Sequence, residues 1–134
     1  MWVCPECNRK FARNKQSHSC IEYDPEDLFI GKGEDIRHLC NLLIDRVKEF
    51  GEIEVHSGKW GLTIRRLSTF LSILIEKNHI TLVFISVQPI DEFPVYQNYQ
   101  HTGSRYSNSV KIESEDEIDD QLIRWLKQAW ELAC

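Results

Sequence analysis

The first twenty residues hold four side chains of the types that bind zinc in proteins. Three cysteines and one histidine are spaced as Cys4-x2-Cys7-x10-His18-x1-Cys20. Three thiolates and one imidazole form the ligand set of a closed, tetrahedral structural zinc site, which leaves no position for a reactive water. A segment this short buries too little apolar surface to fold alone, so the metal would supply its folding free energy. We therefore predict a structural Zn²⁺ held by these four residues. The alternative is a reduced segment without metal, in which Cys20 is an incidental thiol.

The segment between the two ligand pairs is basic. It contains no acidic residue and four basic residues, which are Arg9, Lys10, Arg13 and Lys15. Such side chains contact phosphate groups, so the segment predicts an interaction with nucleic acid. Four charges are few, and an acidic remainder of the chain would repel a long duplex. A solvated basic face and a surface that docks a protein partner therefore stay open as alternatives.

Composition and charge divide the chain into two parts. Of its 134 residues, 42% are hydrophobic and 28% charged, which argues against a disordered or fibrous chain. Residues 1–24 carry four basic against three acidic residues, and residues 25–134 carry 12 against 18. No apolar stretch approaches the roughly 20 residues of a membrane-spanning helix. Five cysteines, three of them clustered, suit metal binding better than disulfides. We expect a cytoplasmic protein without a membrane partner, and the sequence leaves its oligomeric state open.

Hydrophobic periodicity predicts two main helices. Apolar residues at helical spacing indicate one helix over residues 34–50, which Gly51 ends. The second begins near residue 114, where Ser114 and Glu117 have the spacing of a capping box, and runs to the C-terminus. A short helical turn is expected from Pro25 to near Gly31.

Alternating and β-branched runs predict strands at residues 52–56, 62–67, 70–75, 80–87 and 107–112. Only four residues separate the third run from the fourth, and this spacing requires an antiparallel hairpin. Residues 89–105 are polar and aromatic and contain Pro89, Pro94 and Gly103. They are predicted to form a loop.

This loop and the predicted strands supply polar and aromatic side chains for a candidate ligand site. Arg65, Tyr99, His101 and Arg105 would line a pocket for an anionic or aromatic ligand, with arginine as a bidentate clamp and the rings as stacking faces. The alternative is that the tyrosines and the histidine simply cover the open face of the sheet.

Motifs of the common catalytic classes are absent from the sequence. It has no serine nucleophile elbow, no phosphate-binding glycine loop, no HExxH helix and no acidic metal-nuclease pattern. Cys40 falls on the apolar stripe of the helix predicted over residues 34–50, which argues against a reactive thiolate. We therefore assign no catalytic residue, and an enzyme is not favoured.

Two parts of the chain resemble known patterns. Residues 2–11 and 16–20 resemble the bacterial zinc-knuckle pattern W-x-C-P-x-C-G-R-x-F…Q-x-H-S-C, with Asn8 where the pattern has glycine. The body resembles the domain of unknown function 5655 family at Asp27–Phe29, Phe50–Gly51, Arg65, Phe70, Leu82–Ile85, Tyr99, His101, Ile118–Asp119, Trp125–Leu126 and Ala129. The resemblance implies an α+β fold, with a zinc knuckle over residues 1–24 and, over residues 25–134, a curved antiparallel sheet packed against two main helices. It implies no established activity.

These observations together predict a zinc-binding, non-enzymatic binding or adaptor protein that contacts nucleic acid through the basic knuckle. Two alternatives remain. The protein is a protein–protein interaction module, or its body binds a small anionic ligand near Arg65, Tyr99 and His101.

Overall fold

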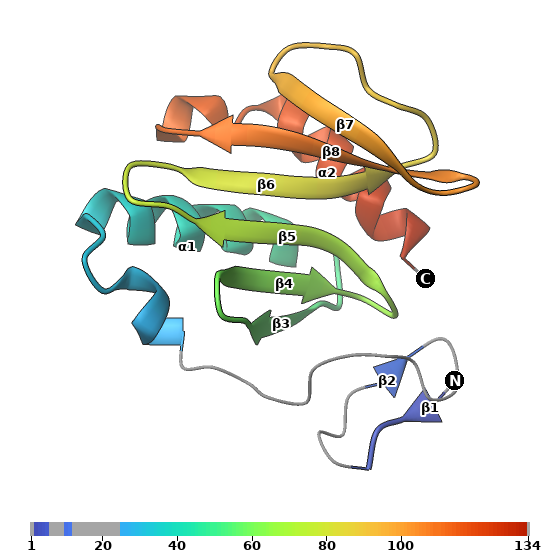
Figure 1. The fold of residues 1–134 in the computed structure, drawn as a ribbon, viewed down its shortest axis with the longest axis horizontal. Helices are drawn as coiled ribbons and strands as arrows, with labels where there is room; N and C mark the ends of the chain where they lie inside the picture. The colour runs from blue at the N-terminus through green and yellow to red at the C-terminus, as the bar shows by residue number, and fades with distance from the viewer. Residues whose placement is uncertain (1, 6–9, 12–24, 134) are drawn as a thin grey trace.

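The computed structural model describes residues 2–5, 10–11 and 25–133 (Figure 1). The short elements are β1 (Trp2–Val3), β2 (Lys10–Phe11) and the two 3₁₀ helices η1 (Pro25–Phe29) and η2 (Glu115–Glu117). The long helices are α1 (Glu34–Lys48) and α2 (Asp120–Leu132). The remaining strands are β3 (Glu54–Ser57), β4 (Gly61–Arg65), β5 (Thr69–Ile75), β6 (Ile80–Ser86), β7 (Val95–Thr102) and β8 (Arg105–Ile112).

Strands β3 to β8 form one six-stranded sheet in the order β3-β4-β5-β6-β8-β7. Every neighbouring pair is antiparallel, including the predicted hairpin of β5 and β6. With two helices on an antiparallel sheet, the fold is α+β, as predicted.

Both helices cover the same face of this sheet. Each contacts β6 and they contact each other, and Figure 1 shows both on the far side of the strands. Side chains alternate between the two faces of a strand, so every second residue points to the helices. The cross-strand partners Leu62, Ile73, Leu82 and Val110 form one such row, and each is at most 5% exposed. The core therefore lies between this face and the helices.

The prediction of a loop over residues 89–105 is wrong for the second half of this segment. Residues 95–102 form β7, which pairs only with β8 and lies at one edge of the sheet. Residues 96–100 of β7 are all exposed, so both faces of this strand meet solvent and neither requires a row of apolar residues. Tyr96 and Tyr99 are accordingly more than half exposed. The missing apolar pattern therefore hid a strand that is stabilised by its ladder with β8.

The capping box lies at a different element from the predicted one. The Glu117 carboxylate accepts a hydrogen bond from the Ser114 amide at 3.2 Å, and this box begins the single turn of η2. The α2 helix starts five residues later, with Asp119 as its N-cap accepting from the Leu122 amide at 2.9 Å. Because η2 and α2 each have their own N-cap, the chain forms two separate helical elements where one continuous helix was predicted. Within the described residues, no helix is both long and apolar enough to cross a membrane.

Candidate functional site

The predicted zinc ligands lie almost entirely outside the described residues. Only Cys4 is described; it directly follows β1 and is 3% exposed. Cys7, His18 and Cys20 fall outside, and so do Arg9, Arg13 and Lys15 of the basic segment. Lys10 belongs to β2, where its backbone pairs with Val3. The zinc site and the nucleic-acid contact therefore stay predictions.

The structure does not bring the four predicted ligand-binding residues of the body together. Tyr99, His101 and Arg105 belong to the β7–β8 hairpin, whereas Arg65 ends β4. Strands β5, β6 and β8 lie between β4 and β7, a separation of about 19 Å at ordinary strand spacing.

Arg65 is also occupied by structural contacts. It is only 4% exposed, and its guanidinium donates to the Leu67 carbonyl at 2.7 Å and lies 3.6 Å from a Glu54 carboxylate oxygen. Because Arg65 anchors the backbone at the end of its own strand, we do not retain the pocket predicted around it.

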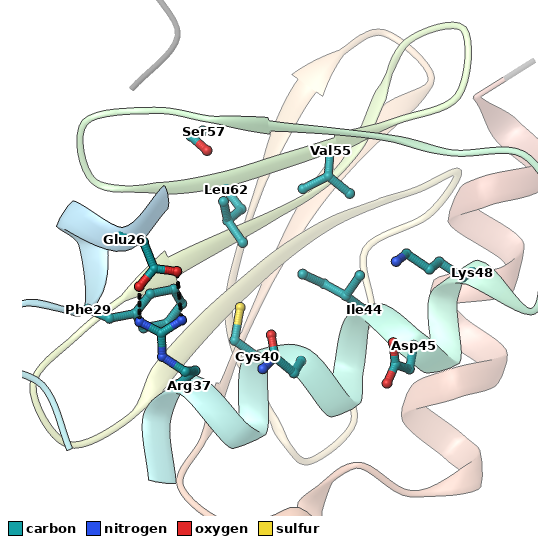
Figure 2. Close-up of a pocket in the computed structure, with 11 residues that line it drawn as sticks. Glu26, Phe29, Arg37, Cys40, Ile44, Asp45, Lys48, Val55, Ser57 and Leu62 are labelled. Carbon is teal, nitrogen blue, oxygen red and sulfur yellow. Dashed lines mark hydrogen bonds and ion pairs between the residues drawn. The ribbon is translucent and has the colours of Figure 1, made fainter. Parts of the chain in front are cut away.

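A pocket that sequence reasoning missed lies between α1, η1 and the β3–β4 hairpin, and we call it the α1 pocket (Figure 2). Its volume is about 620 Å³. The α1 pocket is lined by Glu26, Phe29, Arg37, Cys40, Asn41, Ile44, Asp45, Lys48, Val55, Ser57 and Leu62.

Helical periodicity produces one wall of the α1 pocket. Arg37, Asn41, Ile44 and Lys48 recur every three or four residues, so they share one side of α1. The first and the last are eleven positions apart, which is about 17 Å along the helix axis. The wall therefore runs along most of α1 and carries a basic residue at each end.

The hairpin supplies the opposite wall, and the floor between the walls is apolar. Ser57 of β3 and Leu62 of β4 are cross-strand partners, and both are at most 8% exposed. Cys40 is fully buried, while Val55 at the rim is 36% exposed. The buried thiol and leucine below, together with the exposed polar residues of α1 above, form a lining that accepts an amphipathic ligand.

An ion pair closes one end of the α1 pocket. The Arg37 guanidinium donates from Nη1 and Nη2 to the two Glu26 carboxylate oxygens at 2.9 and 2.5 Å, and its carbon lies 4.5 Å above the centre of the Phe29 ring (Figure 2). The hydrogen bonds from Arg37 hold the pKa of Glu26 below its ordinary value of 4.5. This pair joins η1 to α1, and its two charges neutralise each other.

We expect the Glu26 carboxyl to titrate below 4.5 in the folded protein and to return toward that value in Arg37→Gln. A lowered pKa in the folded state means that the pair stabilises the fold above pH 4.5 and is lost as the pH falls through the lower value. Carboxyl carbon shifts followed by NMR measure this titration. Arg46→Gln removes a cation from the same helix and should leave Glu26 unchanged. An equal effect of both variants would contradict the bidentate pair.

The thiol of Cys40 lies at the floor of the α1 pocket and is not a nucleophile. Burial raises its pKa to about 11 from 9.0, although the nearby Arg37 charge opposes the shift. Only the thiolate attacks electrophiles or binds metal, so this group stays protonated and inert at neutral pH. The sequence prediction that Cys40 is an unreactive core residue agrees with this environment.

The raised pKa of Cys40 predicts a loss of stability in base. The unfolded thiol ionises near pH 9.0 and the folded thiol near pH 11, so the stabilising contribution is complete below pH 9 and is lost between these values. From pH 8 to pH 10 the wild type should lose about 1 kcal/mol more than Cys40→Ala. Urea unfolding at the two pH values measures the difference. Parallel losses in both proteins would show that the thiol ionises normally.

The family model described as Domain of unknown function (DUF5655) matches residues 26–133. The chain belongs to the DUF5655 family. The matched DUF5655 region starts at Glu26 and contains the complete six-stranded sheet, both long helices and every residue of the α1 pocket. Neither a curated protein nor a solved structure gives a match.

Sequence reasoning missed the α1 pocket because its signals are weak or distant. Glu26 and Arg37 are separated by ten residues and by a change of element, so no local spacing pairs them. Asn41 and Lys48 look like ordinary solvated helix residues, and Val55 and Leu62 look like ordinary strand residues. One sequence signal for the pocket was present: Arg37 and Lys48 lie at the two ends of a helix face that carries both polar and apolar residues.

Proposed function

We propose that this DUF5655 protein is a non-enzymatic binding protein whose body takes a small, largely apolar ligand in the α1 pocket. The α1 pocket itself carries the proposal. Its volume of about 620 Å³ lies in the range of ligand-binding cavities, and it combines an apolar floor with a few polar groups at the rim. Asn41 and Ser57 offer hydrogen bonds across the floor to orient a ligand.

The chemistry of the lining supports binding rather than catalysis. A thiol with a pKa near 11 does not supply a nucleophile at neutral pH. Glu26 and Arg37 neutralise each other through two hydrogen bonds, so neither is poised as a general acid or base. The thiol and this ion pair are therefore committed to structure, and the preceding contacts assign no catalytic role to them.

A neutral fluorescent probe tests the proposal. We expect N-phenyl-1-naphthylamine to bind the full-length protein with a rise in fluorescence, and Val55→Trp to weaken binding at least ten-fold by filling the α1 pocket. Val87→Trp is the matched control, because Val87 is also exposed and lies outside this pocket. Binding that is absent from the wild type, or equally strong in both variants, would refute the α1 pocket as the ligand site.

The zinc knuckle over residues 1–24 is proposed from its ligand spacing. Support comes from the antiparallel pairing of Trp2 with Phe11, because Cys4 directly follows the first of these two strands and is buried. A thiolate site also suits the reducing cytoplasm, where we place the protein. Elemental analysis should find one equivalent of zinc, reduced in Cys20→Ser. Wild-type protein without zinc would refute the site.

Nucleic-acid binding through Arg9, Lys10, Arg13 and Lys15 is a second proposed activity, supported by the absence of acidic residues between the ligand pairs. Fluorescence polarisation with short DNA and RNA at two salt concentrations measures it. Binding should weaken with salt and in Arg13→Ala, but not in the control Lys77→Ala in the turn of the β5–β6 hairpin. Salt-independent or absent binding would leave a protein partner as the alternative for this surface.

A further inference from the structure

We infer that the α1 pocket selects an apolar ligand that bears a single carboxylate, with the Lys48 ammonium as the group that binds it. The inference rests on the proposed function and adds the ligand class. Four charged residues line the pocket, two basic and two acidic, so net charge alone favours no ligand. The distribution of these charges is what creates the preference.

Of the two basic residues, only Lys48 is available to a ligand. Both Arg37 terminal nitrogens donate to Glu26, and a second carboxylate at that end would meet the Glu26 charge. Lys48 is exposed, and no carboxylate of the described residues lies within ion-pair distance of it. The pocket therefore has one neutralised end and one cationic end.

Lys48 is also directed toward the apolar part of the pocket. Figure 2 shows its side chain extending from the end of α1, with the nitrogen pointing toward Ile44 and Val55. A lysine laid over apolar groups keeps its ammonium at the water boundary, where the anionic end of an amphipathic molecule also lies. A carboxylate at Lys48 leaves the apolar portion of the ligand over Ile44, Val55 and Leu62.

The Asp45 carboxylate repels an anionic ligand and therefore reduces the preference of the pocket for a carboxylate. It lies one turn before Lys48 on α1 and is exposed. In Figure 2 the Lys48 nitrogen lies between the Asp45 carboxylate and Val55, so Lys48 is the charge that a ligand over Val55 meets first. One exposed ammonium suits one carboxylate, whereas a phosphate dianion would need more donors than this end provides.

Competition between matched amphiphiles tests the inference. Decanoate and decanol share an apolar chain and differ in charge, and each is titrated against bound N-phenyl-1-naphthylamine. We expect decanoate to displace the probe from the wild type about three- to five-fold more effectively, in low salt, as is typical of one exposed ion pair. The preference should disappear in Lys48→Gln and increase in Asp45→Asn. Circular dichroism confirms that each variant is folded.

Lys127→Gln is the matched control, because Lys127 is exposed on α2, lies outside the α1 pocket and changes the net charge by the same amount. It should keep the preference for decanoate. Equal displacement by decanoate and decanol in the wild type would overturn the inference and leave the proposed function intact. A preference that survives in Lys48→Gln would overturn the role of Lys48. Failure of the probe to bind the wild type would refute the proposed function instead.

Discussion

Replacing Gly61 with alanine will destabilise the fold by about 3 kcal/mol, because the new methyl group has no room. A Cβ at this position would lie 2.0 Å from the Ile73 carbonyl oxygen and 2.9 Å from the Leu74 Cα. Both atoms belong to the backbone of β5, which pairs with β4 through Gly61 and Leu74. Neither can rotate away, so the two strands must separate. Leu62, the next residue, lines the α1 pocket, and the variant should therefore also weaken binding of the neutral probe.

Urea unfolding followed by tryptophan fluorescence measures the effect of Gly61→Ala. Gly58→Ala is the matched control from the same turn, since its Cβ would lie 3.4 Å from the Gly61 carbonyl oxygen, an ordinary contact distance. That control should change the free energy of unfolding by less than about 1 kcal/mol. If the two variants unfold alike, β4 and β5 do not approach each other as closely at Gly61 as the structure has them.

Asn108→Leu will lower the free energy of unfolding by about 3 kcal/mol. It will also break the contact that holds Ile90, in the segment before β7, to β8. Asn108 is fully buried in β8. Its side-chain oxygen accepts from the Ile90 amide at 3.2 Å, and its nitrogen donates to the Phe84 carbonyl at 3.3 Å and to the Ser86 hydroxyl at 2.9 Å. Leucine has a similarly branched but larger side chain and makes none of these bonds. Several polar groups would then lose the partner they have in the folded state.

Two measurements distinguish the loss of global stability from the local loss of the contact at Ile90. Urea unfolding gives the total loss, and amide hydrogen exchange at Ile90 reports the local contact, which should lose protection in Asn108→Leu. The control is Asn98→Ala, because Asn98 donates to the Ile90 carbonyl at 2.9 Å from an exposed position. Its loss should cost about 1 kcal/mol at most. Unchanged protection of the Ile90 amide in Asn108→Leu would contradict the buried contact.

The sequence was sufficient where an element depends on its own periodicity. The α1 helix begins at Glu34, as predicted, and its apolar stripe is the buried face. The β5–β6 hairpin has the predicted pairing, because four connecting residues permit no other. The family resemblance of the body is confirmed by the match over residues 26–133. In each case the decisive interactions are close in sequence or depend on a simple hydrophobic pattern.

The sequence by itself determined the α+β class, the main helices, the central hairpin and the inert character of Cys40. Only the tertiary structure decided that Arg65 lies three strands away from the β7–β8 hairpin and that β7 is a strand. It alone joined Glu26 to Arg37 and placed Lys48 beside an apolar floor. The physical reason is the distance along the sequence over which each kind of interaction acts. Helix periodicity and turn lengths act over a few residues, whereas strand order and a pocket between a helix and a hairpin depend on how separate elements pack.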